Sequence, residues 1–451
     1  MPSRTTDGSR PISRREMLIG SSVAGGVALA GCLGDDGAGD DVNGDDLPGA
    51  ITFLHSETAD ERRAVFNDPL GVEYEEETGV EMNQRVIQEA DYAQEITTAV
   101  ASDTLPDVGS ISNDVVLAAR EAIDPATELV EEIGEDRFYD KVLDLTRLPD
   151  GSYSGVPLRA WPQLTIARRS AFDEIGMDAP QTWNDWLDAA EEFHDPDNNE
   201  YGCLVGTAVD QYTRQCFAGF ALSNNARVFD EDGNIIFDSD EMIEALEVYG
   251  ELAQYTPPGD TDSSTIGEVY DAGNAQLYSG NAYSLYFNSL GLEEGEMLGE
   301  YHEPAIQEER AATYGQVEVL STFTDKTEGE RQAAEDWIRL LMGEFDISHH
   351  IQYLHMQVGG FQPVLPEIPE MEEYRDNDIL SHWPDELIEE TLPEAQQSIE
   401  QFGFRDGTVF PEIGPIVGNF DIAQAVSDVI DGEDPRTVAE EAADRMRDRI
   451  D

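Results

Sequence analysis

Apolar and polar positions near residue 50 begin to follow the spacings of strands and helices in alternation. Five elements in the order strand, helix, strand, helix, strand are expected at residues 50–54, 60–78, 80–86, 92–102 and 105–108. The first is a short apolar run behind a Pro-Gly pair, and Gly79 suits the C-terminal cap of the first helix. This order is typical of an α/β unit with a parallel sheet.

Apolar residues recur at helical spacing further along the chain. Amphipathic helices are expected at residues 183–193, 242–252, 334–341 and 435–450, and strands at 202–206 and 284–287. Thr182 and Asp185 resemble a capping box, and Pro435 suits a first helical turn. The periodicity directs Trp183 and Trp186 toward the core.

The charge of the chain is strongly one-sided, with 96 acidic and 26 basic residues and a formal net charge of −70. Such self-repulsion opposes folding in dilute buffer, but molar salt shortens the screening length to about 3 Å. Since 40% of the residues are hydrophobic, we interpret the chain as a salt-adapted globular protein, similar to proteins of extreme halophiles. The absence of a basic patch in the sequence argues against binding to nucleic acid or anionic lipid.

The N-terminus has the features of an export signal. Arg14 and Arg15 precede a short apolar run, Met17–Ala30, which Gly and Ser residues dilute. The pair fits a twin-arginine signal, and Leu-Ala-Gly-Cys32 resembles a lipobox. We therefore predict that residues 1–31 are a signal peptide and that a lipid on Cys32 anchors the protein to the extracellular face of the membrane. The alternative is a weak transmembrane anchor, for which the run is short.

The Gly- and Asp-rich residues 32–50 are predicted to form a flexible tether. About 400 residues follow, which is more than one core usually serves, so two domains are expected. Cys203 and Cys216 could form a disulfide outside the membrane or remain two buried thiols. The sequence has no CxxC or HExxH motif and indicates neither a metal site nor a cofactor. The three histidines of residues 349–355 lie on an apolar helical stretch and are expected to be packed or partly exposed.

Six segments occur in the order found in a known family. They are Tyr74–Met82, Leu105–Val108, Gly155–Pro157, Phe172–Trp183, Tyr278–Tyr283 and Ile430–Pro435. Each segment alone is a weak signal, but together they extend over most of the chain. The chain resembles extracellular solute-binding protein family 1, the maltose-binding-protein-like class of sugar-type ABC importers.

The resemblance implies an α/β, periplasmic-binding-protein-like fold of type II, with two α/β lobes joined by a hinge and a ligand cleft between them. Lobe one would comprise residues 51–158 plus 317–344, and lobe two residues 159–316 plus 345–451. The protein would capture a sugar or oligosaccharide outside the membrane and deliver it to ABC permease subunits. Ligands of open α/β sheets do lie beyond the carboxyl ends of strands, which independently favours such a cleft.

A sugar offers hydroxyl groups and apolar C–H faces, so its site needs carboxylates, amides and aromatic rings. The candidate contacts are His55, Glu57, Asn113, Asp114, Trp161, Asp210, Tyr212, Asn288, Gly360, Phe361 and Phe420. Trp161 is the favoured contact, because it lies just past the Gly155–Pro157 segment. Phe361 and Phe420 could equally be core residues. The family often has Tyr-Asn-Lys at the position of Ala167-Arg168-Arg169, so the resemblance does not determine the identity of the solute.

Two alternatives remain at the level of the sequence. The same fold could bind a polyamine, a peptide or a phosphorylated polyol, and a phosphate would draw attention to Arg159, Arg168 and Arg214. A surface-tethered hydrolase is the more distant alternative. The sequence has no GxSxG, Ser-x-x-Lys or phosphate-loop motif, and acidic residues are too frequent for any pair to be informative. We therefore expect no enzymatic activity.

Overall fold

The computed structural model describes residues 47–450 except 89–90, 114–119, 149 and 406. The predicted signal peptide, Cys32 and most of the predicted tether lie outside the described residues. The described residues belong to one compact unit. In the part of the chain that the structure describes, no helix combines the length and apolar character needed to cross a membrane.

The N-terminal α/β unit forms as the sequence predicts. Strand β1 (Ala50–His55) pairs in parallel with β2 (Glu81–Val86) and with β3 (Val108–Ser112). The single helix predicted for residues 60–78 is divided into α1 (Asp60–Val65) and α2 (Val72–Thr78) by the kinked segment η2 (Phe66–Gly71), where Asp68 before Pro69 has an extended backbone. Helix α3 (Tyr92–Ser102) follows β2 as predicted. Gly79 ends α2 with a positive φ of 74°, a conformation that glycine adopts without steric cost.

The third strand begins later than predicted. Asp107 precedes β3, its side chain accepting a 2.7 Å hydrogen bond from Thr52 N–H and its own N–H donating to Thr52 O at 3.0 Å. Ser110 and Ser112 therefore lie inside β3 and not beyond its end. The proline at position 106 has no N–H to offer a ladder, which explains why pairing starts after it.

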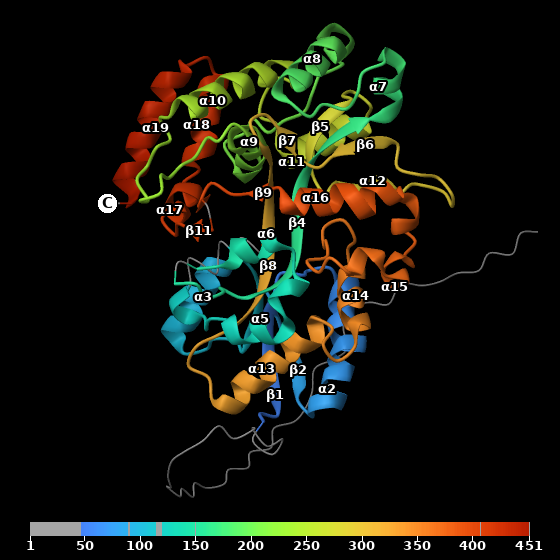
Figure 1. Ribbon diagram of the computed structural model, residues 1–451, viewed down its shortest axis with the longest axis vertical. Helices are drawn as coiled ribbons and strands as arrows, with labels where there is room; N and C mark the ends of the chain where they lie inside the picture. Colours follow the sequence, from blue (N-terminus) through green and yellow to red (C-terminus); the bar gives the residue numbers. More distant parts are fainter. Residues whose placement is uncertain (1–46, 89–90, 114–119, 149, 406, 451) are drawn as a thin grey trace, which may run out of the picture. The chain divides into compact units, whose positions relative to one another are not determined.

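Two long strands connect the parts of the main sheet, whose order is β2-β1-β3-β8-β4-β5. β8 (Ala311–Thr322) lies antiparallel to β3 and to the first half of β4 (Val156–Arg168). The second half of β4 pairs antiparallel with β5 (Leu277–Asn281) and β6 (Glu300–Glu303). The sheet is therefore mixed, and the predicted parallel arrangement holds for β2, β1 and β3. Figure 1 shows β4 and β8 running side by side between these regions.

Helices cover the sheet along the whole unit (Figure 1). The remaining helices are α5 (Thr127–Ile133), α6 (Asp140–Thr146), α7 (Arg169–Ile175), α8 (Trp183–Phe193), α9 (Gln211–Ser223), α10 (Asp240–Leu252), α11 (Ser263–Asp271), α12 (Tyr283–Ser289), α13 (Glu328–Leu341), α14 (Ile347–His355), α15 (Glu372–Arg375), α16 (Leu392–Gln397), α17 (Ile413–Gly418), α18 (Asp421–Ile430) and α19 (Pro435–Ile450). The remaining short strands are β7 (Ile306–Gln307), β9 (Ile399–Glu400), β10 (Phe404–Arg405) and β11 (Thr408–Val409).

The four amphipathic helices predicted from periodicity are confirmed as α8, α10, α13 and α19. Thr182 and Asp185 form the expected capping box at the start of α8, and Trp183 and Trp186 are buried. α13 returns to the N-terminal sheet, where Trp337 packs 5.4 Å from the ring of Phe53. α14 follows it there, with Tyr353 6.2 Å from Phe66. The predicted lobe boundary at residue 344 stays a prediction.

Two predicted strands are absent at their expected positions. Residues 284–287 belong to helix α12, in which Leu285 is buried and Phe287 is 59% exposed. Four residues with mixed polarity fit a strand or a helix, so periodicity could not decide between them. Residues 202–206 contribute one isolated bridge, Leu204 with Tyr278, and no continuous strand.

Cys203 and Cys216 are both buried free thiols, so the disulfide alternative is wrong for this structure. The Cys203 thiol donates to Leu252 O at 3.5 Å, whereas Cys216 lies 3.9 Å from the side-chain amide of Gln163. His349 and His350 pack inside the protein as expected. Among the described residues, no group of three or more His, Cys, Asp or Glu side chains has an arrangement that could hold a metal ion.

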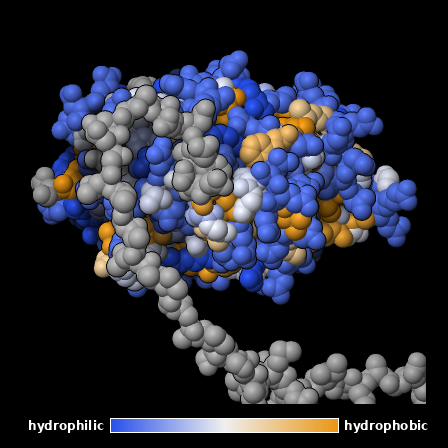
Figure 2. Space-filling model, turned by 90° about the horizontal axis from the view of Figure 1, so that it is seen from below, coloured by the Kyte–Doolittle hydropathy of each residue, from blue (hydrophilic) through white to orange (hydrophobic). Residues whose placement is uncertain are grey.

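The surface shown in Figure 2 is mainly hydrophilic, with apolar residues in small separate areas. With 96 acidic and 26 basic residues, most carboxylates have no cation of the chain available to them. Their mutual repulsion therefore depends on the screening supplied by the solvent.

We predict that 2 M NaCl raises the free energy of unfolding relative to 0.1 M NaCl. The reason is that the screening length falls from about 10 Å at 0.1 M to about 3 Å at 1 M, which removes repulsion between surface carboxylates. Urea denaturation at each salt concentration measures the effect. Sucrose at matched water activity is the control, since it favours compact states without screening charge. Equal stabilisation by sucrose and salt would contradict the electrostatic explanation.

Candidate ligand-binding site

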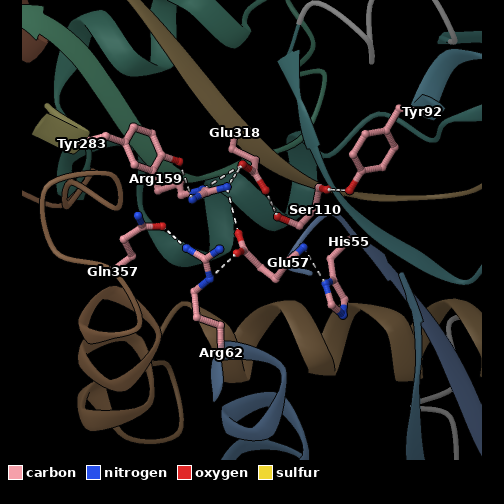
Figure 3. Close-up of polar contacts among 9 residues, drawn as sticks. All are labelled: His55, Glu57, Arg62, Tyr92, Ser110, Arg159, Tyr283, Glu318 and Gln357. Carbon is pink, nitrogen blue, oxygen red and sulfur yellow. Dashed lines mark hydrogen bonds and ion pairs between the residues drawn. The ribbon is translucent and has the colours of Figure 1, made fainter. Parts of the chain in front are cut away.

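A buried group of charged and aromatic side chains lies where β4 and β8 run side by side (Figure 3). Arg159 of β4 is at its centre and is 4% exposed. Its Nε donates to Glu318 Oε2 at 2.8 Å, and its Nη2 donates to Glu57 Oε1 at 3.3 Å. We call Arg159, Glu57, Glu318, Arg62, Tyr283 and Phe361 the Arg159 cluster.

The secondary structure brings the charged members of the cluster together from distant parts of the chain. Glu57 follows the carboxyl end of β1, and Arg62 of α1 places its Nε 3.0 Å from Glu57 Oε2. Glu318 of β8 lies directly opposite Arg159 in the register of the two strands. Two carboxylates thus face two guanidinium groups. Buried charges require such pairing, because removing a charge from water is costly.

Polar side chains around the cluster complete its hydrogen bonds. Ser110 of β3 donates to Glu318 Oε1, and Tyr92 of α3 donates to Ser110 O at 2.6 Å. Arg62 also donates to the side-chain carbonyl of Gln357, just past α14. Figure 3 shows these contacts as one connected network. The network links β1, β3, β4 and β8 with the segment that follows α14.

Aromatic rings line the same region. The Arg159 guanidinium lies 3.7 Å from the centre of the Phe361 ring, and its Nη1 donates to the Tyr283 hydroxyl at 3.3 Å. Trp161, two residues further along β4, lies 6.1 Å from Tyr283 and 5.8 Å from Tyr314. A Cβ atom at position 360 would come within 2.1 Å of the Tyr283 ring, so the glycine there is required for this approach.

The burial of the site alters its protonation. Burial raises the pKa of Glu57, whereas the neighbouring Arg159 guanidinium lowers it. Burial lowers the pKa of His55 to about 4, so this ring is neutral at neutral pH. The geometry assigns its tautomer: Nδ1 accepts from Glu57 N–H at 3.1 Å, and Nε2 therefore donates to Gln84 Oε1 at 2.9 Å. His55 thus fixes the start of the segment that carries Glu57.

Five of the candidate contacts predicted from the sequence meet in or beside the Arg159 cluster. They are His55, Glu57, Trp161, Gly360 and Phe361. Phe361 is fully buried against the Arg159 guanidinium, which is the core role of the two that the sequence left open. Asp114 lies outside the described residues.

The structure gives the other candidates local roles and joins none of them to the cluster. Asn113 is buried and donates to Leu145 O at 2.6 Å. Asp210 caps α9 by accepting from Thr213 N–H at 2.9 Å, and Tyr212 donates to Ser279 O at 2.5 Å. Asn288 lies 3.4 Å from Glu300 Oε1 beside a separate surface hollow. Phe420 is 43% exposed at the start of α18.

Sequence analysis did not predict the following residues of this region: Arg62, Tyr283, Tyr314, Gln316, Glu318 and Gln357. It named Arg159 only as a possible partner of a phosphate group on the solute. A signal for some of them exists. Tyr314, Gln316 and Glu318 alternate with apolar neighbours along β8, as Arg159 and Trp161 do along β4. Period-two alternation places each set on one face of the sheet. Register decides which residues of β4 lie opposite which residues of β8, and the sequence does not contain that information.

Comparison with known proteins identifies the family. A family model described as bacterial extracellular solute-binding protein matches residues 57–291, more than half of the chain. The chain belongs to this family of solute-binding proteins. The resemblance proposed from six short segments is thereby confirmed.

Relatives of this solute-binding protein include a putative ABC transporter periplasmic-binding protein, YcjN, of Escherichia coli K12. The two are 29% identical over 410 residues, which cover 89% of this chain and 92% of the relative. An arabinooligosaccharide-binding protein of Halalkalibacterium halodurans is 24% identical over 147 residues, 31% of this chain and 32% of that protein.

Solved structures share the fold of this solute-binding protein. The sugar-binding protein MalE of Xanthomonas citri has a TM-score of 0.72 at 17% identity, covering 89% of this chain and 97% of that one. Maltose-bound MalE3 of T. maritima has a TM-score of 0.69 at 16% identity, covering 88% and 99%. An ABC transporter solute-binding protein of Agrobacterium radiobacter K84, in complex with ribitol, has a TM-score of 0.69 at 17% identity, covering 89% of this chain and 99% of that one. The predicted periplasmic-binding-protein-like α/β fold of type II is confirmed.

We predict that Arg159→Met lowers the free energy of unfolding of this solute-binding protein by about 3–5 kcal/mol, since it leaves the partly buried Glu318 without a cation among the described residues and removes one of the two guanidinium partners of Glu57. Chemical denaturation in high salt measures the loss. Adding Glu318→Gln should restore part of the stability, because one uncompensated charge is then removed. The control Arg436→Met breaks an exposed pair with Asp240 and should change stability little. Equal effects of the two arginine substitutions would contradict the central role of Arg159.

Proposed function

We propose that this protein is the substrate-binding component of an ABC importer, which captures a sugar or oligosaccharide outside the membrane and delivers it to the permease. One observation carries the proposal. In a chain of this family, Trp161 packs beside Tyr283 of the Arg159 cluster. The relatives named for arabinooligosaccharide, maltose and ribitol support a hydroxylated solute.

The chemistry of the site suits such a solute. Trp161 is only partly buried, so part of its indole is available to the apolar C–H face of a sugar ring. Tyr283 is also partly buried and carries a hydroxyl group that can bond to solute hydroxyls. The ion pairs fix Arg159, which bonds to the Tyr283 hydroxyl, and a preorganised site loses less entropy on binding.

The protein would act on the extracellular face of the cell membrane. A twin-arginine signal in residues 1–31, a lipid on Cys32 and a tether to residue 50 would export it and anchor it there. The partners would be the solute and ABC permease subunits. A hinge motion of two lobes would close on the solute, and the closed population would rise because the solute contacts both lobes in that state.

The alternative solutes are less well supported. A polyamine needs carboxylates that lack cationic partners, but Glu57 and Glu318 already pair with arginines of the chain. The relatives reported above are named as binding proteins, which supports binding without chemical conversion over a tethered hydrolase.

We predict that a binding saccharide raises the melting temperature in high salt, because it binds the native state and not the unfolded chain. A concentration 100 times the Kd stabilises the native state by about 2.7 kcal/mol. Differential scanning calorimetry with mono- and oligosaccharides, peptides and spermidine tests the solute class. A shift with spermidine or peptides and with no saccharide would remove the sugar assignment.

We predict that Trp161→Ala weakens binding of that saccharide by at least about 1 kcal/mol through loss of ring stacking. Titration calorimetry measures the affinity, and Trp161→Phe should retain part of it. The matched control is Phe420→Ala, which truncates an exposed aromatic ring that makes no contact with the Arg159 cluster in the described structure. If both alanine variants bind like the wild type, the site is misplaced.

A further inference from the structure

We infer that the solute carries a carboxylate group and that Arg214 of α9 recognises it, which makes an acidic sugar the cargo. This inference rests on the proposed function, since it names the chemical class of the solute for the same site. It depends on three observations about Arg214: its lack of a carboxylate partner among the described residues, its contact with Tyr314, whose ring packs near Trp161, and the helix terminus on which it lies.

Arg214 is a buried cation without a carboxylate partner among the described residues. It is 9% exposed, and its single hydrogen bond in this part of the chain runs from Nη2 to the Tyr314 hydroxyl at 3.3 Å. Its Nε is buried and has no acceptor among the described residues. Arg159, buried to a similar degree, has both Glu57 and Glu318. An uncompensated buried charge is costly, so a protein retains one where an opposite charge arrives from outside.

The position of Arg214 connects it to the proposed sugar site. Its guanidinium carbon lies 5.3 Å from the centre of the Tyr314 ring, and that ring lies 5.8 Å from Trp161. Trp161 in turn lies 6.1 Å from Tyr283, which bonds to Arg159. Tyr283 thus connects the indole to Arg159, which carboxylates neutralise. Tyr314 connects the indole to Arg214, which has no carboxylate partner among the described residues.

The groups nearest to Arg214 favour an anion over a cation. Gln316 directs its amide N–H to the Tyr314 hydroxyl at 2.9 Å, so this oxygen accepts from both Gln316 and Arg214. Arg214 also lies in the first turn of α9, where the helix dipole favours negative charge. The nearby carboxylate of Asp210 accepts from Thr213 N–H and forms no ion pair with Arg214.

A carboxylate fits this site better than a phosphate does. The planar guanidinium offers parallel N–H donors that match the two oxygens of a carboxylate. One uncompensated guanidinium balances one negative charge, whereas a phosphate monoester carries nearly two at neutral pH. The chain itself has a net charge of −70, so it repels anions in general and needs a specific cation to bind one.

The test compares acidic sugars with their neutral counterparts by titration calorimetry on the exported chain in 2 M NaCl. The probes are D-galacturonate against D-galactose, D-glucuronate against D-glucose, digalacturonate against galactobiose, and glucose 6-phosphate. We expect at least one acidic sugar to bind at least about 10-fold more tightly than its neutral counterpart. A hydrogen bond between charged groups contributes enough free energy for such a difference in affinity.

Substitutions then assign the preference to Arg214. Arg214→Gln should reduce the acid preference to about 2-fold or less while changing neutral-sugar affinity little, and Arg214→Lys should keep part of the preference. Arg168→Gln is the matched control, because Arg168 stacks on Tyr270 outside the Arg159 cluster. It should keep the full preference. Melting curves check that each variant folds, and the wild-type comparison does not depend on any variant.

The outcomes separate this inference from the proposed function. Neutral sugars that bind as tightly as their acids would overturn the inference and leave the sugar importer standing. If the Arg214→Gln variant still prefers acidic sugars, the role of Arg214 is wrong. If glucose 6-phosphate binds more tightly than every acidic sugar, the assignment of a carboxylate to the solute is wrong. Failure of every saccharide, with binding of a peptide or spermidine, would overturn both proposals.

Discussion

The register between β4 and β8 is the constraint on which the site depends. It sets Arg159 opposite Glu318 and Trp161 opposite Gln316, so one face of two neighbouring strands carries a guanidinium, a carboxylate, an indole and an amide. A slip of one residue would turn each of these side chains to the other face of the sheet. The same two strands connect the N-terminal sheet to β5 and β6, so the contacts that hold the molecule together also assemble the site.

Charge balance inside the molecule contrasts with the charge of the whole chain. A net charge of −70 implies repulsion over most of the surface, yet the Arg159 cluster contains two guanidinium groups and two carboxylates. Two of the scarce basic residues, Arg62 and Arg159, lie there, where burial makes a lone carboxylate costly. Salt screening acts mainly on exposed charges, so the surface and the cluster respond differently to the solvent.

Sequence reasoning predicted those parts of the fold that local patterns determine. The strands and helices of residues 50–112 and the four amphipathic helices follow from the local spacing of apolar residues. Thr182 and Pro435 indicate where their helices begin, because both residues suit a helix N-terminus. Local patterns were insufficient at residues 284–287, where four residues fit either element. They also could not reveal Glu318 as the partner of Arg159, because 158 residues separate the two and pairing depends on strand register. Trp161 and Glu57 were found because each lies next to a recognisable strand end or motif.

The two arginines that contact the tyrosines beside Trp161 illustrate a general division between stability and recognition. Arg159 has its full complement of carboxylates, so it contributes to the folded state whether or not a solute is bound. Arg214 has no carboxylate partner among the described residues, and a buried charge without one would lower stability until an anion binds. Local rules of charge pairing are broken in natural proteins mainly at functional sites, where the cost is recovered on binding. An anion that binds Arg214 would recover that cost, so recognition and stabilisation of the native state would occur in the same step.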